Sequence, residues 1–307
     1  MRERTTVVLH PLHSPGVPEA LSGVPDISLV LPATEGDIPA ALARDAVFVT
    51  YIWNDAYLVP GLRWLQSHSA GYNQFPIDKL RERGVVLTSA SGVHIVCAEH
   101  AIGLLLALTR DIHLGIRAMP AKTWDTHVAP EVAGRTVVIA GLGAIGEAIA
   151  VRLAGWDVRL IGVTRSPKDY RGVLEDVRPL PALADACREA SILMVALPLA
   201  TETRHLVTGA VLDALGAGWV TNVSRGPVID EAALIERLRD GRLLGAGLDV
   251  TETEPLPADS PLWNMGNVVI TPHMAGLTPR YGERLAKLLT ENLRAYRGEG
   301  PWRNRIV

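Results

Sequence analysis

The stretch Val137-Val138-Ile139-Ala140-Gly141-Leu142-Gly143-Ala144-Ile145-Gly146 is an apolar run that leads directly into three closely spaced glycines. The glycines fit the pattern G-x-G-x-x-G, and residues 144–154 have the composition of an amphipathic helix. In such a strand, turn and helix, the first glycine permits a tight turn, the second lets a pyrophosphate approach the backbone, and the third lets the helix pack on the strand. We therefore predict that Gly141, Gly143, Ala144 and Ile145 bind a dinucleotide at the helix N-terminus. A purely structural glycine turn is the alternative, and the flanking strand, helix and second strand argue against it.

The alternation of strands and helices continues from this turn toward the C-terminus. We expect strands at residues 136–140, 158–163, 192–197, 219–223, 245–250 and 268–271, and helices at 144–154, 209–215 and 231–239. Apolar strands that alternate with helices are typical of a parallel sheet covered on both faces. The sequence thus predicts an α/β protein with a Rossmann-type doubly wound parallel sheet.

The residues before this part predict a second, smaller α/β domain. Short β-type runs lie at residues 5–10, 27–32, 46–52, 62–67 and 85–89, and a helix of about five turns is expected at 95–114. Near the C-terminus Leu285, Leu288, Leu289, Leu293 and Tyr296 form one apolar helix face, which we expect to return to the N-terminal domain. We therefore predict one domain from residues 1–93 and 278–307, and a dinucleotide-binding domain from residues 94–277.

The end of the second strand of the dinucleotide unit indicates which cofactor binds. An NAD enzyme usually places Asp or Glu there, about twenty residues after the glycines, to bind the ribose 2′-hydroxyl. Here the strand ends in Thr164-Arg165-Ser166. Arg165 can pair with a 2′-phosphate, and the two hydroxyl groups can donate to it. This predicts NADP(H) in preference to NAD(H), although Arg165 as an ordinary surface arginine is the alternative.

Composition and charge exclude several classes of partner. The chain has 307 residues, a formal net charge of −3 and no long run of Lys or Arg, which argues against a nucleic-acid or anionic-membrane surface. The N-terminus lacks the apolar region of a secretory signal, and no apolar stretch approaches a membrane span. With only two cysteines, Cys97 and Cys187, neither a disulfide framework nor a metal site is expected, and the expected location is cytoplasmic. Because His94 and His100 do not share a helix face and have no third ligand nearby, they are not expected to bind metal.

Three polar segments each follow an expected strand of the dinucleotide-binding domain. They are 222–226 with Arg225, 247–255 with Asp249, Glu252 and Glu254, and 271–276 with His273. Because the carboxyl ends of parallel strands gather at one crevice, an arginine, a carboxylate and a histidine should meet beside the nicotinamide. Glu252 competes with Glu254 for the carboxylate role.

With these segments the sequence resembles the D-isomer-specific 2-hydroxyacid dehydrogenase family, which includes glyoxylate and hydroxypyruvate reductases and phosphoglycerate dehydrogenases. The resemblance runs from about Ser67 to Thr278. Its further motifs are Ser69-Ala70-Gly71-Tyr72, Ser91-Gly92-Val93-His94, Ala98-Glu99-His100, Leu197-Pro198-Leu199 followed by Thr203, and Gly226-Pro227-Val228-Ile229-Asp230-Glu231. Glu254 directly precedes Pro255, as in the family pattern, which favours it over Glu252. Asn73 departs from the family, since many members carry Asp there.

The resemblance implies reduction of a small 2-keto acid, such as glyoxylate or hydroxypyruvate, to a D-2-hydroxy acid. It places Arg225, Glu254 and His273 at the catalytic positions. It further implies that the N–H groups of Gly71 and Tyr72 bind the substrate carboxylate, and that Leu197, Pro198, Thr203 and Asp249 contact the cofactor, with Asp249 near the nicotinamide carboxamide. The smaller domain is then a flavodoxin-like substrate-binding domain that closes by a hinge. A homodimer through the dinucleotide-binding domains is expected, with the helix that begins near Ile95 and the apolar stretch 104–108 at the interface.

The chemistry agrees with these roles. Hydride reaching the keto carbon leaves negative charge on oxygen, so the site needs a proton donor and a fixed cation. His273 would supply the proton, Glu254 would orient the ring and favour its protonated form, and Arg225 would hold the carboxylate and polarise the carbonyl.

Other functions remain open at this point. One is a non-enzymatic dinucleotide sensor that resembles the C-terminal-binding-protein corepressors, and another is a dehydrogenase for a bulkier keto acid. Glu254 argues against a formate dehydrogenase, which usually carries Gln there. Trp53, Tyr72, His94, Leu277 and Tyr281 are the side chains expected to shape the substrate pocket, and Trp53 can equally belong to the core.

Overall fold

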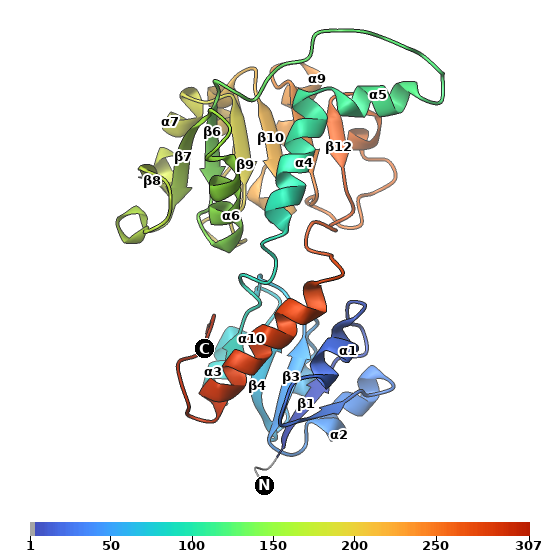
Figure 1. Cartoon of the computed structure of the whole chain (residues 1–307), viewed down its shortest axis with the longest axis vertical. Coiled ribbons are helices and arrows are strands. Elements are labelled where there is room, and N and C mark those ends of the chain that lie inside the picture. Colours follow the sequence, from blue (N-terminus) through green and yellow to red (C-terminus); the bar gives the residue numbers. More distant parts are fainter. Residues whose placement is uncertain (1–3) are drawn as a thin grey trace. The chain divides into compact units, whose positions relative to one another are not determined.

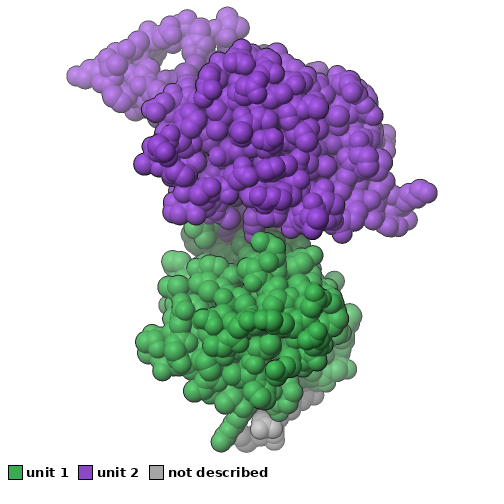
Figure 2. Space-filling view, turned by 180° about the vertical axis from the view of Figure 1, so that it is seen from behind, with its two compact units in different colours: residues 1–94, 277–307 green, residues 95–276 purple. Residues whose placement is uncertain are grey.

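The computed structural model describes residues 4–307, and the chain divides into two compact units. Unit 1 comprises the described residues up to His94 together with Leu277–Val307, and unit 2 comprises Ile95–Gly276 (Figure 2). Met1, Arg2 and Glu3, with which the expected N-terminal domain begins, lie outside the described residues. No helix within residues 4–307 has both the length and the apolar character needed to cross a membrane.

Unit 1 is built on a five-stranded parallel sheet with the strand order β2-β1-β3-β4-β5, of which β1, β3 and β4 are labelled in Figure 1. This is the flavodoxin-like order, so the expected architecture of the smaller domain is confirmed. The strands are β1 (Thr5–Leu9), β2 (Ile27–Val30), β3 (Ala46–Thr50), β4 (Leu62–Ser67) and β5 (Val86–Thr88). The helices are α1 (Val17–Ser22), α2 (Ile38–Ala41), α3 (Ile77–Glu82) and α10 (Tyr281–Tyr296), with short 3-10 turns η1 (Glu35–Asp37) and η2 (Asp55–Tyr57).

Neighbouring residues of a strand point to opposite faces of the sheet, and each face of this sheet is covered by an apolar cluster. In β1, Val7 and Leu9 lie in the cluster that includes Leu285 and Leu289 of α10, whereas Val8 lies in the cluster on the other face. The apolar face of the C-terminal helix therefore packs against the N-terminal strands, as its spacing predicts.

Unit 2 is built on a seven-stranded parallel sheet with the order β12-β11-β10-β9-β6-β7-β8. The strand order reverses between β6 and β9, as in a doubly wound Rossmann-type fold, and the predicted fold class is confirmed. The strands are β6 (Thr136–Ala140), β7 (Arg159–Thr164), β8 (Asp176–Pro179), β9 (Ile192–Val195), β10 (Trp219–Asn222), β11 (Gly245–Leu248) and β12 (Val268–Ile270). The helices are α4 (Cys97–Thr109), α5 (Ile112–Ala118), α6 (Ala144–Leu153), α7 (Leu183–Arg188), α8 (Gly209–Leu215) and α9 (Glu231–Arg239), and the 3-10 turns are η3 (Pro167–Asp169), η4 (Leu180–Ala182), η5 (Gly226–Val228) and η6 (Pro261–Asn264).

The prediction of one long helix at residues 95–114 is wrong in one respect, because the structure has two helices there, α4 and α5. Asp111 adopts a left-handed backbone with φ +53° between the two helices. Strand β8 and helix α7 were not predicted; β8 begins and ends with the polar or turn-forming residues Asp176 and Pro179, so its composition carries little strand signal.

Part of the apolar stretch 104–108, which was expected at a dimer interface, lies in the core, whereas Leu106 and Ala107 are partly exposed. Leu104, Leu105 and Leu108 of α4 lie in the core cluster of unit 2, against the sheet. Gly247 in β11 permits this close packing, since a Cβ there would lie 2.8 Å from Leu104 Cβ. These leucines stabilise the unit itself and are not free to contact a second chain.

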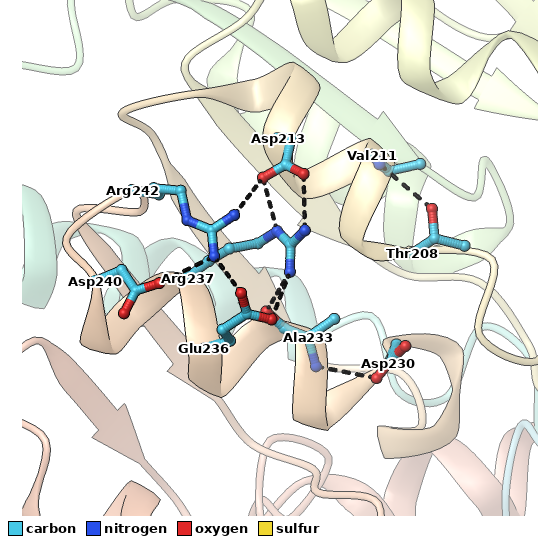
Figure 3. A network of polar contacts seen from close by, with 9 residues as sticks. All are labelled: Thr208, Val211, Asp213, Asp230, Ala233, Glu236, Arg237, Asp240 and Arg242. Carbon is cyan, nitrogen blue, oxygen red and sulfur yellow. Dashed lines mark hydrogen bonds and ion pairs between the residues drawn. The ribbon is translucent and has the colours of Figure 1, made fainter.

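An ion-pair network joins α8 to α9. It allows a test of how burial changes the contribution of an ion pair to the free energy of unfolding. Arg237 donates to both carboxylate oxygens of Asp213 at 2.8 and 2.7 Å, and Arg242 donates to the same group at 3.1 Å (Figure 3). The Arg237 side chain is 10% exposed, whereas that of Arg242 is 41% exposed.

We expect Arg237→Ala to lower the free energy of unfolding by about 2 kcal/mol, because it removes a buried, two-pronged charged hydrogen bond. Arg242→Ala, the matched control, should cost less than about 1 kcal/mol, as is usual for an exposed pair. Urea unfolding of both variants measures the difference. Equal losses in the two variants would contradict the role assigned to burial.

Candidate active site

Three loops that follow neighbouring strands bring the predicted polar residues to one edge of the unit 2 sheet. Arg225 follows β10, Glu254 follows β11 and His273 follows β12, and these strands are adjacent in the sheet. The glycine turn follows β6 at the same carboxyl edge. The topology thus gathers side chains that lie up to about 130 positions apart in the sequence around the end of one sheet.

His273 and Glu254 form a direct pair. Nδ1 of His273 lies 2.7 Å from Glu254 Oε2, and the other carboxylate oxygen accepts from the Thr251 N–H at 3.2 Å. A carboxylate can only accept, so Nδ1 carries a proton and Nε2 is the ring nitrogen left for a ligand. Burial alone would raise the pKa of the Glu254 carboxyl, but the His273 ring, the Thr251 N–H and Arg225 outweigh it and hold the pKa below its ordinary value.

Glu252, the competing carboxylate, pairs with a different histidine. Its Oε1 lies 2.8 Å from His205 Nε2, and its backbone N–H donates to Glu231 Oε2 at 2.8 Å. The structure therefore brings Glu254, and not Glu252, to the His273 ring. Burial raises the pKa of Glu231, while the Glu252 N–H that it accepts acts in the opposite direction.

Arg225 lies beside this pair in a half-buried position. Its Nη1 donates to the Ser224 carbonyl at 2.7 Å, and its own carbonyl accepts from the Asn222 side chain at 3.1 Å. Burial lowers the pKa of the guanidinium, and the Glu254 carboxylate acts against that shift. A guanidinium offers five N–H donors, so most of them remain for an anionic ligand. The next residue is Gly226, and a Cβ there would lie 1.9 Å from the Thr251 carbonyl oxygen, so only glycine lets the two loops meet.

Asp249 is almost fully buried and binds the loop that carries His273. Its carboxylate accepts from the Thr271 hydroxyl at 2.6 Å and from the N–H groups of Met274 and Ala275 at 2.9 and 3.0 Å. The expectation that Asp249 lies near the nicotinamide carboxamide rested on the family resemblance alone. In the structure its oxygens are engaged by the protein's own loop.

The glycine turn has the shape that a dinucleotide needs. Gly141 has φ +101°, and Gly146 is packed so tightly that a Cβ would lie 1.8 Å from the Gly141 carbonyl oxygen. Gly143, by contrast, faces open space and precedes the first residue of α6. The centre of the turn is thus free for a pyrophosphate at the helix N-terminus, with Ala144 and Ile145 as the first helical residues.

The residues expected at the ribose lie at the end of β7. Thr164 is the last residue of that strand, and Arg165 and Ser166 follow in an exposed position. Arg165 forms a close ion pair with Glu202, which sequence reasoning missed. The segment 197–203 is partly structural, since the Thr203 hydroxyl is buried, donates to the Pro198 carbonyl at 2.6 Å and accepts from the Ala200 N–H. Leu197 is buried and Pro198 exposed.

The remaining predicted anchor lies in unit 1, in the loop after β4. The Gly71 carbonyl accepts from the Ser69 hydroxyl at 2.6 Å and the Tyr72 carbonyl from the Phe75 N–H at 3.1 Å. Within residues 4–307, no protein acceptor takes a hydrogen bond from the N–H of Gly71 or Tyr72. Trp53 belongs to the same unit, where its indole donates to Asp55 and its ring packs edge-on against Tyr57 and Phe75.

Sequence reasoning did not find His205 and Glu202. Glu231 and His100 entered it only as parts of family motifs, and His100 also as a metal ligand that was not expected. A second histidine for Glu252 carried no local signal, because the two residues lie 47 positions apart. His100 lies 2.8 Å from the Thr271 hydroxyl, and within residues 4–307 no cluster of side chains is arranged to hold a metal ion.

A glycine turn of this shape, at the sheet edge that also carries an acid-paired histidine and an arginine, defines a nicotinamide-dinucleotide-dependent oxidoreductase. Comparison with known proteins narrows the class. The sequence pattern described as "D-isomer specific 2-hydroxyacid dehydrogenase, NAD binding domain" matches residues 102–275. The chain belongs to the D-isomer-specific 2-hydroxyacid dehydrogenase family, and the resemblance seen in its sequence is confirmed.

Individual relatives agree with this membership. A glyoxylate reductase of Thermofilum pendens is 34% identical over 254 residues, which are 79% of this chain and 74% of the relative. A hydroxyphenylpyruvate reductase of Plectranthus scutellarioides is 35% identical, over 79% of this chain and 78% of the relative. The crystal structure of an NADPH-dependent glyoxylate/hydroxypyruvate reductase of Sinorhizobium meliloti, in complex with NADP and malonate, superimposes with a TM-score of 0.82 at 28% identity and covers 99% of this chain and 97% of that one.

Proposed function

We propose that this protein reduces a small 2-keto acid of the glyoxylate or hydroxypyruvate type to a D-2-hydroxy acid, with NADPH preferred over NADH. The observation that carries the proposal is the 2.7 Å contact between His273 Nδ1 and Glu254, which leaves Nε2 available for a ligand, while the Arg225 guanidinium lies close enough to Glu254 to interact with its charge. The names of the relatives, glyoxylate reductases among them, support the substrate class.

Each residue has a separate role in the reaction. The nicotinamide, when bound, supplies the hydride that reaches the keto carbon. As the carbonyl double bond becomes a single bond to oxygen, His273 Nε2 donates its proton to that oxygen, and the Nδ1–H bond to Glu254 stabilises the cationic ring before transfer. Arg225 binds the substrate carboxylate and stabilises the charge that develops on the carbonyl oxygen.

The cofactor and the carboxylate use backbone groups as well. We assign the turn of Gly141 and Gly143 and the start of α6 to the pyrophosphate, because Gly143 faces open space there. We assign the unpaired N–H groups of Gly71 and Tyr72 to the substrate carboxylate. In this assignment unit 1 is the substrate-binding domain and unit 2 the dinucleotide-binding domain.

Turnover tests the proposal directly. NADPH and NADH are each mixed with glyoxylate, hydroxypyruvate, pyruvate or phenylpyruvate, and the absorbance of the reduced nicotinamide is followed. We expect oxidation of NADPH with the smaller acids. Binding of NADPH without turnover of any keto acid would instead favour the corepressor-like sensor, and a preference for phenylpyruvate would favour the bulkier substrate.

In this proposal Arg165 binds the 2′-phosphate of NADPH, which must compete with the Glu202 carboxylate for the guanidinium. We expect Arg165→Ala to weaken NADPH binding by about 10- to 100-fold, the value of charge-assisted hydrogen bonds. Glu202→Gln should strengthen NADPH binding by about two- to fivefold, because an exposed ion pair that competes with the 2′-phosphate is removed. NADH binding should change in neither variant.

Fluorescence titration of both cofactors measures these affinities. Glu189→Gln is the matched control, because Glu189 also pairs with arginines of unit 2, the exposed Arg159 and the partly buried Arg178, but lies in another part of the unit. If Glu202→Gln weakened NADPH binding, Glu202 would be a cofactor ligand and not a competitor.

We also propose a homodimer, on a different basis from the buried leucines of α4. Large apolar side chains are exposed from α5 onward, and the segment that follows α5 leaves the body of unit 2 before it returns to β6 (Figure 1). They are Ile112, Leu114, Ile116, Met119, Trp124 and Val128, of which Trp124 and Val128 are 96% and 97% exposed. An exposed apolar surface of this extent is typical of an interface, and sedimentation velocity of the wild type and of Trp124→Ser tests it. A cytoplasmic location stays a prediction from the sequence.

A further inference from the structure

The loop that carries His273 is attached to one buried carboxylate. Asp249 Oδ1 accepts from the Thr271 hydroxyl and the Met274 N–H, and Oδ2 accepts from the Ala275 N–H. The Asp249 side chain is 2% exposed. Residues on both sides of His273 are therefore bound to the same group, which lies beneath the loop.

The backbone of His273 itself is held in an unusual conformation. Its φ is +50°, a left-handed value that a residue with a side chain adopts only when its surroundings impose it. The His273 N–H donates to the Asp249 carbonyl at 2.8 Å and to the Thr271 carbonyl at 3.0 Å. The direction of the imidazole thus depends on the bonds that Asp249 and Thr271 make.

A second histidine completes this support from helix α4. Nε2 of His100 lies 2.8 Å from Thr271 Oγ1 and 3.4 Å from Asp249 Oδ1. The Thr271 hydroxyl has one proton, and it donates that proton to Asp249. Its oxygen can therefore only accept from His100, so the structure assigns the proton of His100 to Nε2.

Helix α4 gives this contact a rigid base. Ala101, Leu104 and Leu105, which follow His100 in the helix, are buried in the core of unit 2. A side chain on such a helix is fixed in position, and a donor on it can hold a loop more closely than a residue on another loop can.

We propose that His100, Thr271 and Asp249 form a buried support that positions His273 for proton transfer. The inference rests on the proposed function insofar as His273 is the proton donor. It adds His100 as a positioning residue of the active site, although His100 touches neither His273 nor Glu254 by any contact in the structure.

Two pairs of variants test the support. Thr271→Val keeps the shape of the side chain and removes the hydroxyl, whereas Thr271→Ser restores it. His100→Ala removes the donor, whereas His100→Gln returns an N–H group at the position of Nε2. The matched control is Thr109→Val on the same helix, since the buried Thr109 hydroxyl donates only to the Leu105 carbonyl of α4 itself.

Hydrogen exchange, kinetics and cofactor binding are measured for each variant. Thr271→Val and His100→Ala should speed exchange of the Met274 and Ala275 N–H groups by about tenfold and lower kcat by about tenfold, the size of one lost buried hydrogen bond. The Kd for NADPH should stay within about twofold of the wild type, because neither Thr271 nor His100 is assigned to the cofactor and no hydrogen bond to it is lost. The serine and glutamine variants should recover most of both losses, and Thr109→Val should leave exchange of these two groups unchanged.

Asp249→Asn tests the carboxylate itself. Support of the loop predicts faster exchange of the Met274 and Ala275 N–H groups and a lower kcat. Unchanged exchange in Asp249→Asn would overturn the proposal, as would wild-type exchange and kcat in His100→Ala and Thr271→Val. If the wild type itself turns over no keto acid, the proposed function fails, while hydrogen exchange still decides whether the support exists.

Discussion

His273→Ala is expected to lower kcat for keto-acid reduction by about 10²- to 10⁴-fold, the usual contribution of a general acid. Without Nε2, no side chain assigned to the site donates a proton to the substrate oxygen as negative charge develops on it. The Kd for NADPH and the unfolding temperature should change little, because the His273 side chain is 47% exposed. Single-turnover absorbance measurements with NADPH and glyoxylate give the rate of this step.

The chain contains a matched control for this variant. His205 pairs with Glu252 at 2.8 Å and is 40% exposed, so it repeats the chemistry of the His273 pair in a neighbouring position. His205→Ala removes the same kind of ring but should cost less than about tenfold in kcat, since only one surface charge pair is lost. If the two variants lost activity equally, or His273→Ala stayed folded with more than a tenth of the wild-type kcat, the assignment of the proton donor would be wrong.

Arg225→Ala should lower kcat/KM by about 10²- to 10³-fold, as expected when a fixed donor to the developing oxyanion is removed. The loss should appear in both kcat and KM, because the same guanidinium binds the carboxylate and stabilises the charge on the carbonyl oxygen. Arg225→Lys retains a positive charge without the planar fork, and we expect it to recover only part of the activity. Steady-state kinetics over a range of glyoxylate concentrations separates the two parameters.

Arg204→Ala is the control for Arg225. Arg204 approaches Glu252 at 3.8 Å, so it lies near the same loop. Its side chain is 57% exposed, whereas that of Arg225 is half-buried. Its removal should leave kcat/KM within about threefold of the wild type, as for other exposed ion pairs. Full recovery of activity in Arg225→Lys would contradict bidentate binding of the substrate carboxylate.

Much of the fold could be predicted because its signals are local. The buried run Val137–Ala140 before the glycines, and the apolar face of α10, follow from spacing within a few residues. Glycine positions are informative for the same reason, since Gly146 is enforced by contact with Gly141 five positions away. Among the elements that were missed or misjudged, β8 and the break at Asp111 have weak or contradictory local preferences.

The candidate site was predicted as a set of residues, and of its contacts only the pairing of Glu254 with His273 was expected. That Arg225, Glu254 and His273 lie in loops after strands of one sheet, at its carboxyl edge, followed from the order of a doubly wound sheet. The order of the sheet did not decide which glutamate pairs with His273, because Glu252 and Glu254 lie in the same loop; the family pattern at Pro255 favoured Glu254, and the structure shows that pair.

By itself the sequence determined the α/β class, the dinucleotide turn and the residue types at the strand ends, since each depends on periodicity or turn chemistry within about ten residues. Only the tertiary structure decided that Leu104 and Leu108 are core, that Arg165 faces Glu202, and that His100 supports the His273 loop. These contacts join residues 37 to 171 positions apart. Such distances are closed by packing of whole helices and strands, which no local pattern of side chains specifies.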